Sequence, residues 1–176
     1  MDALLIELTA AAYLIAAGSL FLYLFRGNVA SRLPALLLLA GFIVHSITLS
    51  RLFVRQGFAG VALMGDALLF NSWLMVGIYL LIHLKYRLTV LGGIIAPLAF
   101  LMTFAAFAVS RGTTEVPPGF QTFWLPLHVT LAFLGNAVFA LAFGVSLIYL
   151  LQERHLKHKK LTLVMKRFPP LESLDR

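Results

Sequence analysis

The sequence predicts an all-α membrane protein, a polytopic bundle of about five transmembrane helices. Of its 176 residues, 61% are hydrophobic and only 12% are charged, and the mean hydropathy is +0.94. Water-soluble domains do not combine so little charge with so much apolar length. The apolar residues fall into five long runs, each near or above the ~20 residues that cross ~30 Å of hydrocarbon. Because backbone groups in lipid must be hydrogen-bonded within their own segment, each run is expected to be a helix.

Local signals support the spans in chain order. The first run is too long for the core of a signal peptide and is followed by Arg26, which favours a retained helix. Pro34 stands just inside the start of the second run, where its missing N–H costs nothing. The third run ends at a basic turn with Lys85 and Arg87, the fourth contains Pro97, and the fifth is the longest. The expected spans are 3–25, 33–54, 61–84, 88–109 and 123–151.

The distribution of positive charge predicts the orientation in the membrane. Of 14 Lys and Arg residues, all but Arg51, Arg55 and Arg111 lie on the side that holds the C-terminal end of the chain. Short loops rich in Lys and Arg stay in the cytoplasm, so the N-terminus is expected outside and the C-terminus inside. The chain then divides into a transmembrane domain, 1–151, and a basic cytoplasmic tail, 152–176. The net charge of +7 serves topology and contact with the lipid bilayer, and we expect no nucleic-acid partner.

The composition also excludes several kinds of site. The chain contains no cysteine, which rules out disulfides, thiolate metal sites and cysteine nucleophiles. It has no phosphate-binding loop and no HExxH, GxSxG or GxGxxG motif, so we expect a protein that is not an enzyme. The spans contain no pair of acidic residues of the kind that would indicate an ion pump. Asp66, near the outer end of the third span, is expected to cap its helix or to reach lipid headgroups.

His128 is the first candidate ligand. It lies about five residues into the fifth span, ~7–8 Å from the outer end at a rise of ~1.5 Å per residue. An ionisable residue within a membrane span is a functional candidate by default, and the alternative is a hydrogen bond to another helix. Steps of three and four residues lead from it to a small and polar face, expected to pack against neighbouring helices: Ala132, Gly135, Asn136 and Phe139.

His45 is the second candidate ligand. It lies ~18 Å from the cytoplasmic start of the second span, at a depth close to that of His128, and Gly41 and Thr48 share its face. Neutral imidazole is a good ligand for haem iron, so both histidines are candidates. A structural hydrogen bond between helices is the alternative for each. Trp124, four residues before His128, is placed to lie over a flat ligand, although a tryptophan at the water–lipid boundary is also common in membrane proteins.

The fifth span carries a resemblance to a known family. The run WLPLHVTLAFLGNAVFALAFGVSLIYLLQERHLKHK, followed by PPLESLDR, resembles the cytochrome c assembly protein family of the ResC, CcsA and CcmC kind, including HemX-like proteins. The W-x-x-x-H-V pattern with its small-residue helix and YLLQE exit is the most specific part. The earlier stretches GFIVHSITLSRLF, FNSWL and KYRLTVLG agree more loosely. The resemblance extends over essentially the whole chain.

The resemblance implies a haem-handling protein of a bacterial inner (plasma) membrane. His128 matches the external histidine that ligates haem iron in the family, His45 corresponds with less certainty to a histidine of the second helix, and the cofactor is non-covalent b-type haem. Partners would be other cytochrome c maturation subunits or the apocytochrome. Family members continue into further helices with a tryptophan-rich signature, whereas Trp73 and Trp124 are the only tryptophans here.

Three functions therefore stay open. The first is a subunit that binds or presents haem at the outer membrane face. The second is a HemX-like regulator or scaffold of haem biosynthesis that acts through the basic tail. The third is a helical packing half that works only with a C-terminal half carrying the tryptophan-rich signature.

Overall fold

The computed structural model describes residues 2–26, 32–57, 61, 63–109 and 124–157, and nearly all of these residues are helical. No strand occurs among them. The predicted tail is described only as far as Lys157, and the external loop at 110–122 lies outside the described residues. The helices are α1 (Asp2–Arg26), α2 (Leu33–Gln56), α3 (Met64–Tyr86), α4 (Thr89–Ala108) and α5 (Trp124–Lys157).

All five helices are long and apolar enough to cross a membrane, which confirms the predicted all-α class. The ends differ by a few residues from the expected spans. α3 begins at Met64 because Leu63 before it is extended, and α5 continues to Lys157 because the residues from Gln152 onward are good helix formers. Gly57 ends α2 at φ 66°, a left-handed backbone conformation that only glycine adopts without strain.

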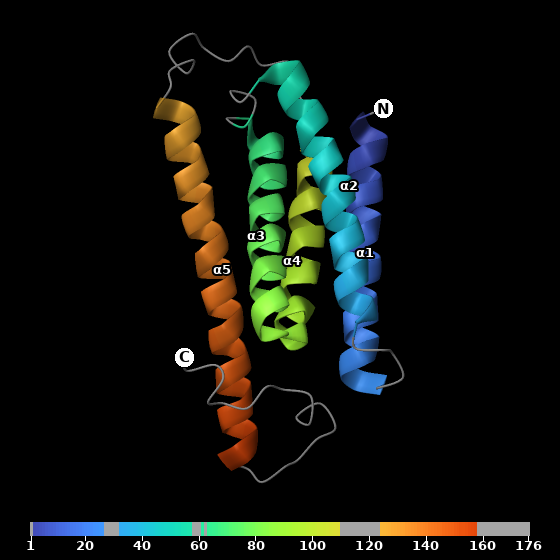
Figure 1. Ribbon diagram of the computed structural model, residues 1–176, viewed down its shortest axis with the longest axis vertical. Coiled ribbons are helices and arrows are strands. Elements are labelled where there is room, and N and C mark those ends of the chain that lie inside the picture. The colour runs from blue at the N-terminus through green and yellow to red at the C-terminus, as the bar shows by residue number, and fades with distance from the viewer. Residues whose placement is uncertain (1, 27–31, 58–60, 62, 110–123, 158–176) are drawn as a thin grey trace.

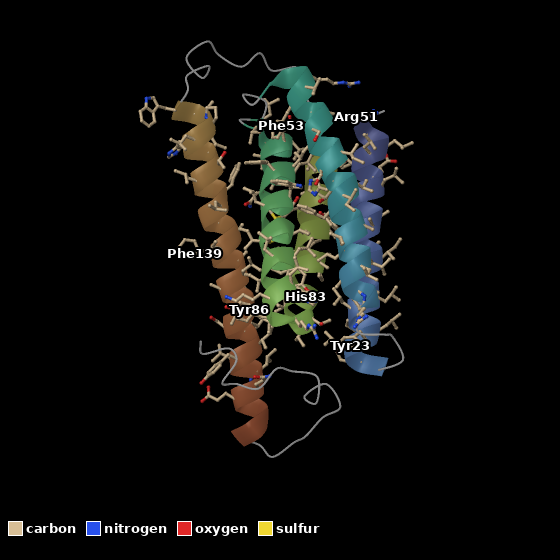
Figure 2. The ribbon with its side chains drawn as sticks, in the orientation of Figure 1. Tyr23, Arg51, Phe53, His83, Tyr86 and Phe139 are labelled. Carbon is tan, nitrogen blue, oxygen red and sulfur yellow. The ribbon has the colours of Figure 1, made fainter. Side chains whose placement is uncertain are left out.

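Successive helices run in opposite directions, so α1, α3 and α5 begin at the same end of the bundle (Figure 1). α1 and α2 lie at one side, α3 and α4 in the middle, and α5 at the other side. Arg51 and Phe53 mark the end at which α5 begins, whereas Tyr23 and His83 lie near the opposite end (Figure 2). The charge distribution predicts that the Arg51 end is the outer one.

α4 is the most buried helix and α5 the least buried. Small residues on α4 allow its backbone to approach α1 and α3 closely, since Ala96, Ala99 and Ala106 are fully buried. α5 packs against α3 and α4 along one stripe that includes Ala137, Leu141 and Ile148. Much of the remaining α5 surface is exposed in the described bundle, and His128 lies on this exposed surface.

Candidate functional site

His45 lies in the interface between α1 and α2. Its side chain is fully buried, and its Nδ1 atom lies 3.0 Å from the hydroxyl oxygen of Tyr13 on α1. The two rings meet edge to face, with centroids 5.6 Å apart. Gly41, one turn before His45, provides the space for the Tyr13 ring, because a Cβ at that position would lie 3.0 Å from two ring carbons. The face that carries Gly41 and His45 is therefore the face that packs on α1.

The bond to Tyr13 assigns the tautomer of His45. A buried phenol needs an acceptor for its proton, and Nδ1 of His45 is the acceptor that the described residues offer. The Nε2 atom then carries the ring proton. It is buried and has no hydrogen-bond partner among the described residues. In this packing Nε2 carries an N–H group, not the lone pair that iron requires.

Two further polar contacts join α1, α2 and α3 near His45. The hydroxyl oxygens of Thr9 and Thr48 lie 3.2 Å apart across the α1–α2 interface. Trp73 on α3 donates its indole N–H to the Ser46 hydroxyl at 2.9 Å, and its ring stacks on Phe42 with centroids 5.4 Å apart. Hydrogen bonds between membrane helices commonly hold such bundles together. This surrounding favours the structural alternative for His45, a side chain that joins helices.

The contribution of the Thr9–Thr48 contact to the free energy of unfolding can be measured directly. We expect Thr9→Val and Thr48→Val each to lower the free energy of unfolding, with a coupling of about 0.6 kcal/mol in the double-mutant cycle. SDS-driven unfolding in mixed micelles measures these values. Ser50→Ala is the matched control, because the exposed Ser50 hydroxyl donates to the Ser46 carbonyl of its own helix and to no other described residue. Fully additive effects of the two valine substitutions would show that the contact contributes nothing.

His128 and Trp124 lie one turn apart in the first turns of α5, and both are exposed on the bundle surface. Trp124 is 72% exposed, as expected for an indole at the boundary between water and lipid. His128 makes no hydrogen bond to a described residue. Its imidazole is therefore available to a ligand that approaches from outside the described bundle.

The structure does not bring the two candidate histidines together. His45 is fully buried at the interface of α1 and α2, whereas α5, which carries His128, packs against α3 and α4. One ring is fully buried and the other is exposed, so the described packing does not offer them as a pair of ligands. No group of three or more His, Cys, Asp or Glu side chains suited to a metal ion occurs within the described ranges.

The prediction that the His128 face packs against neighbouring helices is wrong for the described chain. Ala132, Asn136 and Phe139 are exposed, and a Cβ added at Gly135 would meet nothing within 4 Å. Small and polar residues favour close helix contacts in membranes, but they do not determine which helix supplies the contact. The helices α3 and α4 occupy the opposite side of α5.

One of the two alternatives for Asp66 is wrong. Its side chain is 3% exposed, so it does not reach headgroups, and it lies in the first turn of α3. A carboxylate in the first turn is favoured by the helix dipole. Tyr13 and Thr9, the partners of His45 and Thr48, were not predicted. The available signal was that each places a hydroxyl inside an apolar span, where it needs a hydrogen-bond partner.

Comparison with known proteins gives the family. Residues 61–176 match the family model described as cytochrome C assembly protein, which is more than half of the chain. The chain belongs to the cytochrome c assembly protein family. With five helices that are long and apolar enough to span, this member of the family is a multi-pass membrane protein. No solved structure matches the chain.

Relatives of this family member are considerably longer than it is. The chain is 30% identical over 123 residues to "Protein HemX" of Brevibacillus brevis, which covers 69% of this chain and 45% of that protein. It is 25% identical over 128 residues to "Cytochrome c biogenesis protein CcsA" of Porphyra purpurea, covering 70% and 40%. With the CcsA of Chlamydomonas reinhardtii, the identity is 30% over 99 residues, covering 52% and 28%. The chain thus spans less than half the length of these relatives.

Proposed function

We propose that this protein binds haem without covalent attachment and holds it at the outer face of the membrane during cytochrome c maturation. The observation that carries the proposal is the exposed imidazole of His128, which has no hydrogen bond to a described residue, in a chain of the cytochrome c assembly family. An imidazole at a membrane span needs a partner, and haem iron is one that neutral imidazole binds well. The relatives named for cytochrome c biogenesis support the pathway.

The residues beside His128 fit one face of a haem. Trp124, Leu127 and Leu131 surround it on the exposed surface, and their side chains are 72%, 43% and 57% exposed. Such apolar and aromatic side chains suit the flat apolar surface of a porphyrin. Because the chain has no cysteine, it offers no thiol for covalent attachment, which agrees with b-type haem. In this proposal His128 ligates the iron, and Trp124 covers one edge of the ring.

His45 does not fit the same haem in the described packing. Its ring is fully buried, its Nδ1 atom accepts from Tyr13, and its Nε2 atom is buried without a described partner. A porphyrin would reach Nε2 only if the helices around it rearranged. We therefore assign His45 to the helix interface, and iron ligation by His45 stays a prediction about a rearranged bundle.

The proposal places the protein in a bacterial inner (plasma) membrane, with the start of α5 outside, and gives it no covalent chemistry of its own. One exposed histidine supplies half of an enclosed site, so the other half comes from outside the described residues. The candidates are other maturation subunits, the apocytochrome that receives haem, or a C-terminal half with the tryptophan-rich signature. The length of the relatives, more than twice the matched segment, supports a need for further polypeptide.

A haem titration of the purified full chain tests the proposal. We expect a Soret band on addition of haem to the wild type, and a dissociation constant at least about 10-fold higher for His128→Ala, because the iron loses its protein ligand. Leu150→Ala is the matched control, since it removes an exposed side chain near the other end of the same helix, away from His128. If wild type and His128→Ala give the same titration, the assignment to His128 is wrong.

The similarity to the HemX of Brevibacillus brevis favours a second candidate function. In this alternative the protein is a regulator or scaffold of haem biosynthesis, and the basic tail, 152–176, binds a cytoplasmic enzyme. Co-purification of a haem-biosynthesis enzyme with the full chain, lost when the chain is ended after Leu151, would support it. Binding that survives removal of the tail would count against this alternative.

A further inference from the structure

The α3–α4 turn, residues 85–89, carries positive charge that no described side chain neutralises. Two residues, Arg87 and Leu88, join the end of α3 to the start of α4. Lys85 and Arg87 are both exposed, and neither forms an ion pair with a described carboxylate. α4 contains no acidic residue, and the single acidic residue of α3, Asp66, lies in the first turn at the opposite end of that helix. The turn therefore offers two cations to an anion from outside the described residues.

Helix geometry places these two cations at the level of the lipid headgroups. α3 has 23 residues, so at ~1.5 Å per residue it is ~35 Å long, slightly more than ~30 Å of hydrocarbon. Its last residues and the turn are therefore expected at the boundary with water. Leu81 and Leu84, which are 69% and 78% exposed, lie on the hydrocarbon side of that boundary. Because Leu81 and Lys85 are four residues apart, one face of α3 passes from an apolar side chain to a cation.

Hydrogen bonds hold the turn in one conformation without a ligand. The Arg87 N–H donates to the His83 carbonyl at 2.8 Å, and the Thr89 N–H donates to the Arg87 carbonyl at 2.9 Å. From the buried side, the Tyr79 hydroxyl oxygen lies 3.3 Å from Nδ1 of His83 and 3.5 Å from the Leu88 carbonyl oxygen. The turn therefore has little conformational freedom to lose when it binds a ligand, which favours affinity.

Arg87 adopts a backbone conformation that residues with a side chain rarely adopt. Its φ of 53° and ψ of 36° are left-handed, and the residue after a helix in this conformation is usually glycine or asparagine. Such conflicts between residue type and conformation cluster at functional sites. Beside it, the Lys85 ammonium lies 5.1 Å from the centroid of the Tyr86 ring, which is at the same end of the bundle as His83 (Figure 2). This cation–π contact holds the ammonium at the boundary and leaves its N–H groups without a described acceptor.

We infer that the α3–α4 turn binds the headgroup of an anionic phospholipid through Lys85 and Arg87. A phosphodiester presents a negative charge and acceptor oxygens, which match the donors of an ammonium and a guanidinium. The acyl chains of this lipid lie along the exposed Leu81 and Leu84, which a soluble anion would leave uncovered. Tyr86, 54% exposed, is a residue type common at headgroup level. The charge distribution predicts that this end is cytoplasmic, where anionic lipids attract basic residues next to membrane spans.

Titration of the purified full chain with phosphatidylglycerol in a neutral detergent tests the inference, with native mass spectrometry to count bound lipid. We expect Arg87→Gln to raise the dissociation constant about 5-fold, and the double variant Lys85→Gln/Arg87→Gln about 25-fold, because each basic residue adds a similar attraction. Arg51→Gln is the matched control, since it removes the same charge from an exposed position at the opposite end of the bundle (Figure 2). We expect it to change the constant less than about 2-fold at ~0.15 M salt, which screens distant charges.

Two outcomes of this titration would overturn the inference. Equal effects of Arg87→Gln and Arg51→Gln would show that the lipid responds to net charge and not to the turn. Equal affinity for phosphatidylcholine with the same acyl chains would show that the anionic headgroup is not recognised.

A glycine at position 87 separates lipid binding from a structural role of the arginine. Glycine adopts a φ of 53° without strain, so we expect Arg87→Gly to be at least as stable as the wild type in SDS-driven unfolding. Its affinity for phosphatidylglycerol should nevertheless fall about 5-fold, as for Arg87→Gln. An unchanged affinity would show that Arg87 does not bind the lipid. None of these measurements uses haem, so their outcome is independent of the proposed haem binding at His128.

Discussion

Replacing His45 with alanine is expected to lower the free energy of unfolding by about 3–5 kcal/mol. The substitution empties the space of a fully buried ring and leaves the Tyr13 hydroxyl without its acceptor. A void in a close-packed membrane bundle removes the packing contacts that hold its helices together. The orphaned phenol adds the cost of a buried donor without a partner. SDS-driven unfolding in mixed micelles, followed by circular dichroism, measures the change.

His128→Ala is the control for this prediction because it makes the same chemical change at an exposed position. We expect it to change the free energy of unfolding by less than about 0.5 kcal/mol. The variant Tyr13→Phe removes the phenol oxygen, so its combination with His45→Ala should cost less than the sum of the two single changes. Equal losses of stability for His45→Ala and His128→Ala would contradict the assignment of His45 to the helix interface.

The two histidines thus have different expected readouts. A change at His45 alters stability, and a change at His128 alters haem binding while the bundle stays folded. The depths in the membrane that the sequence predicts do not distinguish the two histidines, since both lie inside apolar spans. The difference comes from their neighbours. Tyr13 and Gly41 enclose His45, whereas the side of α5 that bears His128 has no described helix beside it.

The sequence predicted the helices well because the bilayer leaves few alternatives. A long apolar run in lipid must be helical, so composition determines the element and its approximate length. The ends depended on weaker effects, such as the extended Leu63 before α3 and the helix-forming residues after Leu151 on α5. These shifted each boundary by a few residues without changing the order of the spans.

The sequence did not predict which face of each helix packs inside the bundle. In a soluble protein the buried face is apolar and the exposed face is polar, but lipid and core are equally apolar in a membrane. The face of His45 packs on α1 because Gly41 makes room for a ring that comes from that helix. The face of His128 was read wrongly because Gly135 and Asn136 carry the same kind of signal without a described partner.

Gly92→Val is expected to lower the free energy of unfolding by about 3 kcal/mol relative to Gly18→Val. A Cβ at Gly92 would lie 2.5 Å from the hydroxyl oxygen of Tyr79 and 2.9 Å from its Cζ. Tyr79 is 1% exposed, and its hydroxyl oxygen lies 3.3 Å from Nδ1 of His83, so the ring has little room to move. Gly18 is the matched control, because a Cβ there meets nothing within 4 Å and both sites are helical.

A second substitution separates this clash from a general intolerance of α4 to larger residues. Tyr79→Leu shortens the side chain that a valine at position 92 would strike, so the double variant should be more stable than the sum of the single changes predicts. The excess should reach about 1 kcal/mol or more, since the two side chains share one space. Strict additivity would show that the cost at Gly92 arises elsewhere, for example at Leu20 Cδ1, which lies 3.4 Å from the added Cβ. The contact between Gly92 on α4 and Tyr79 on α3 would then not be what limits the size of the side chain at position 92.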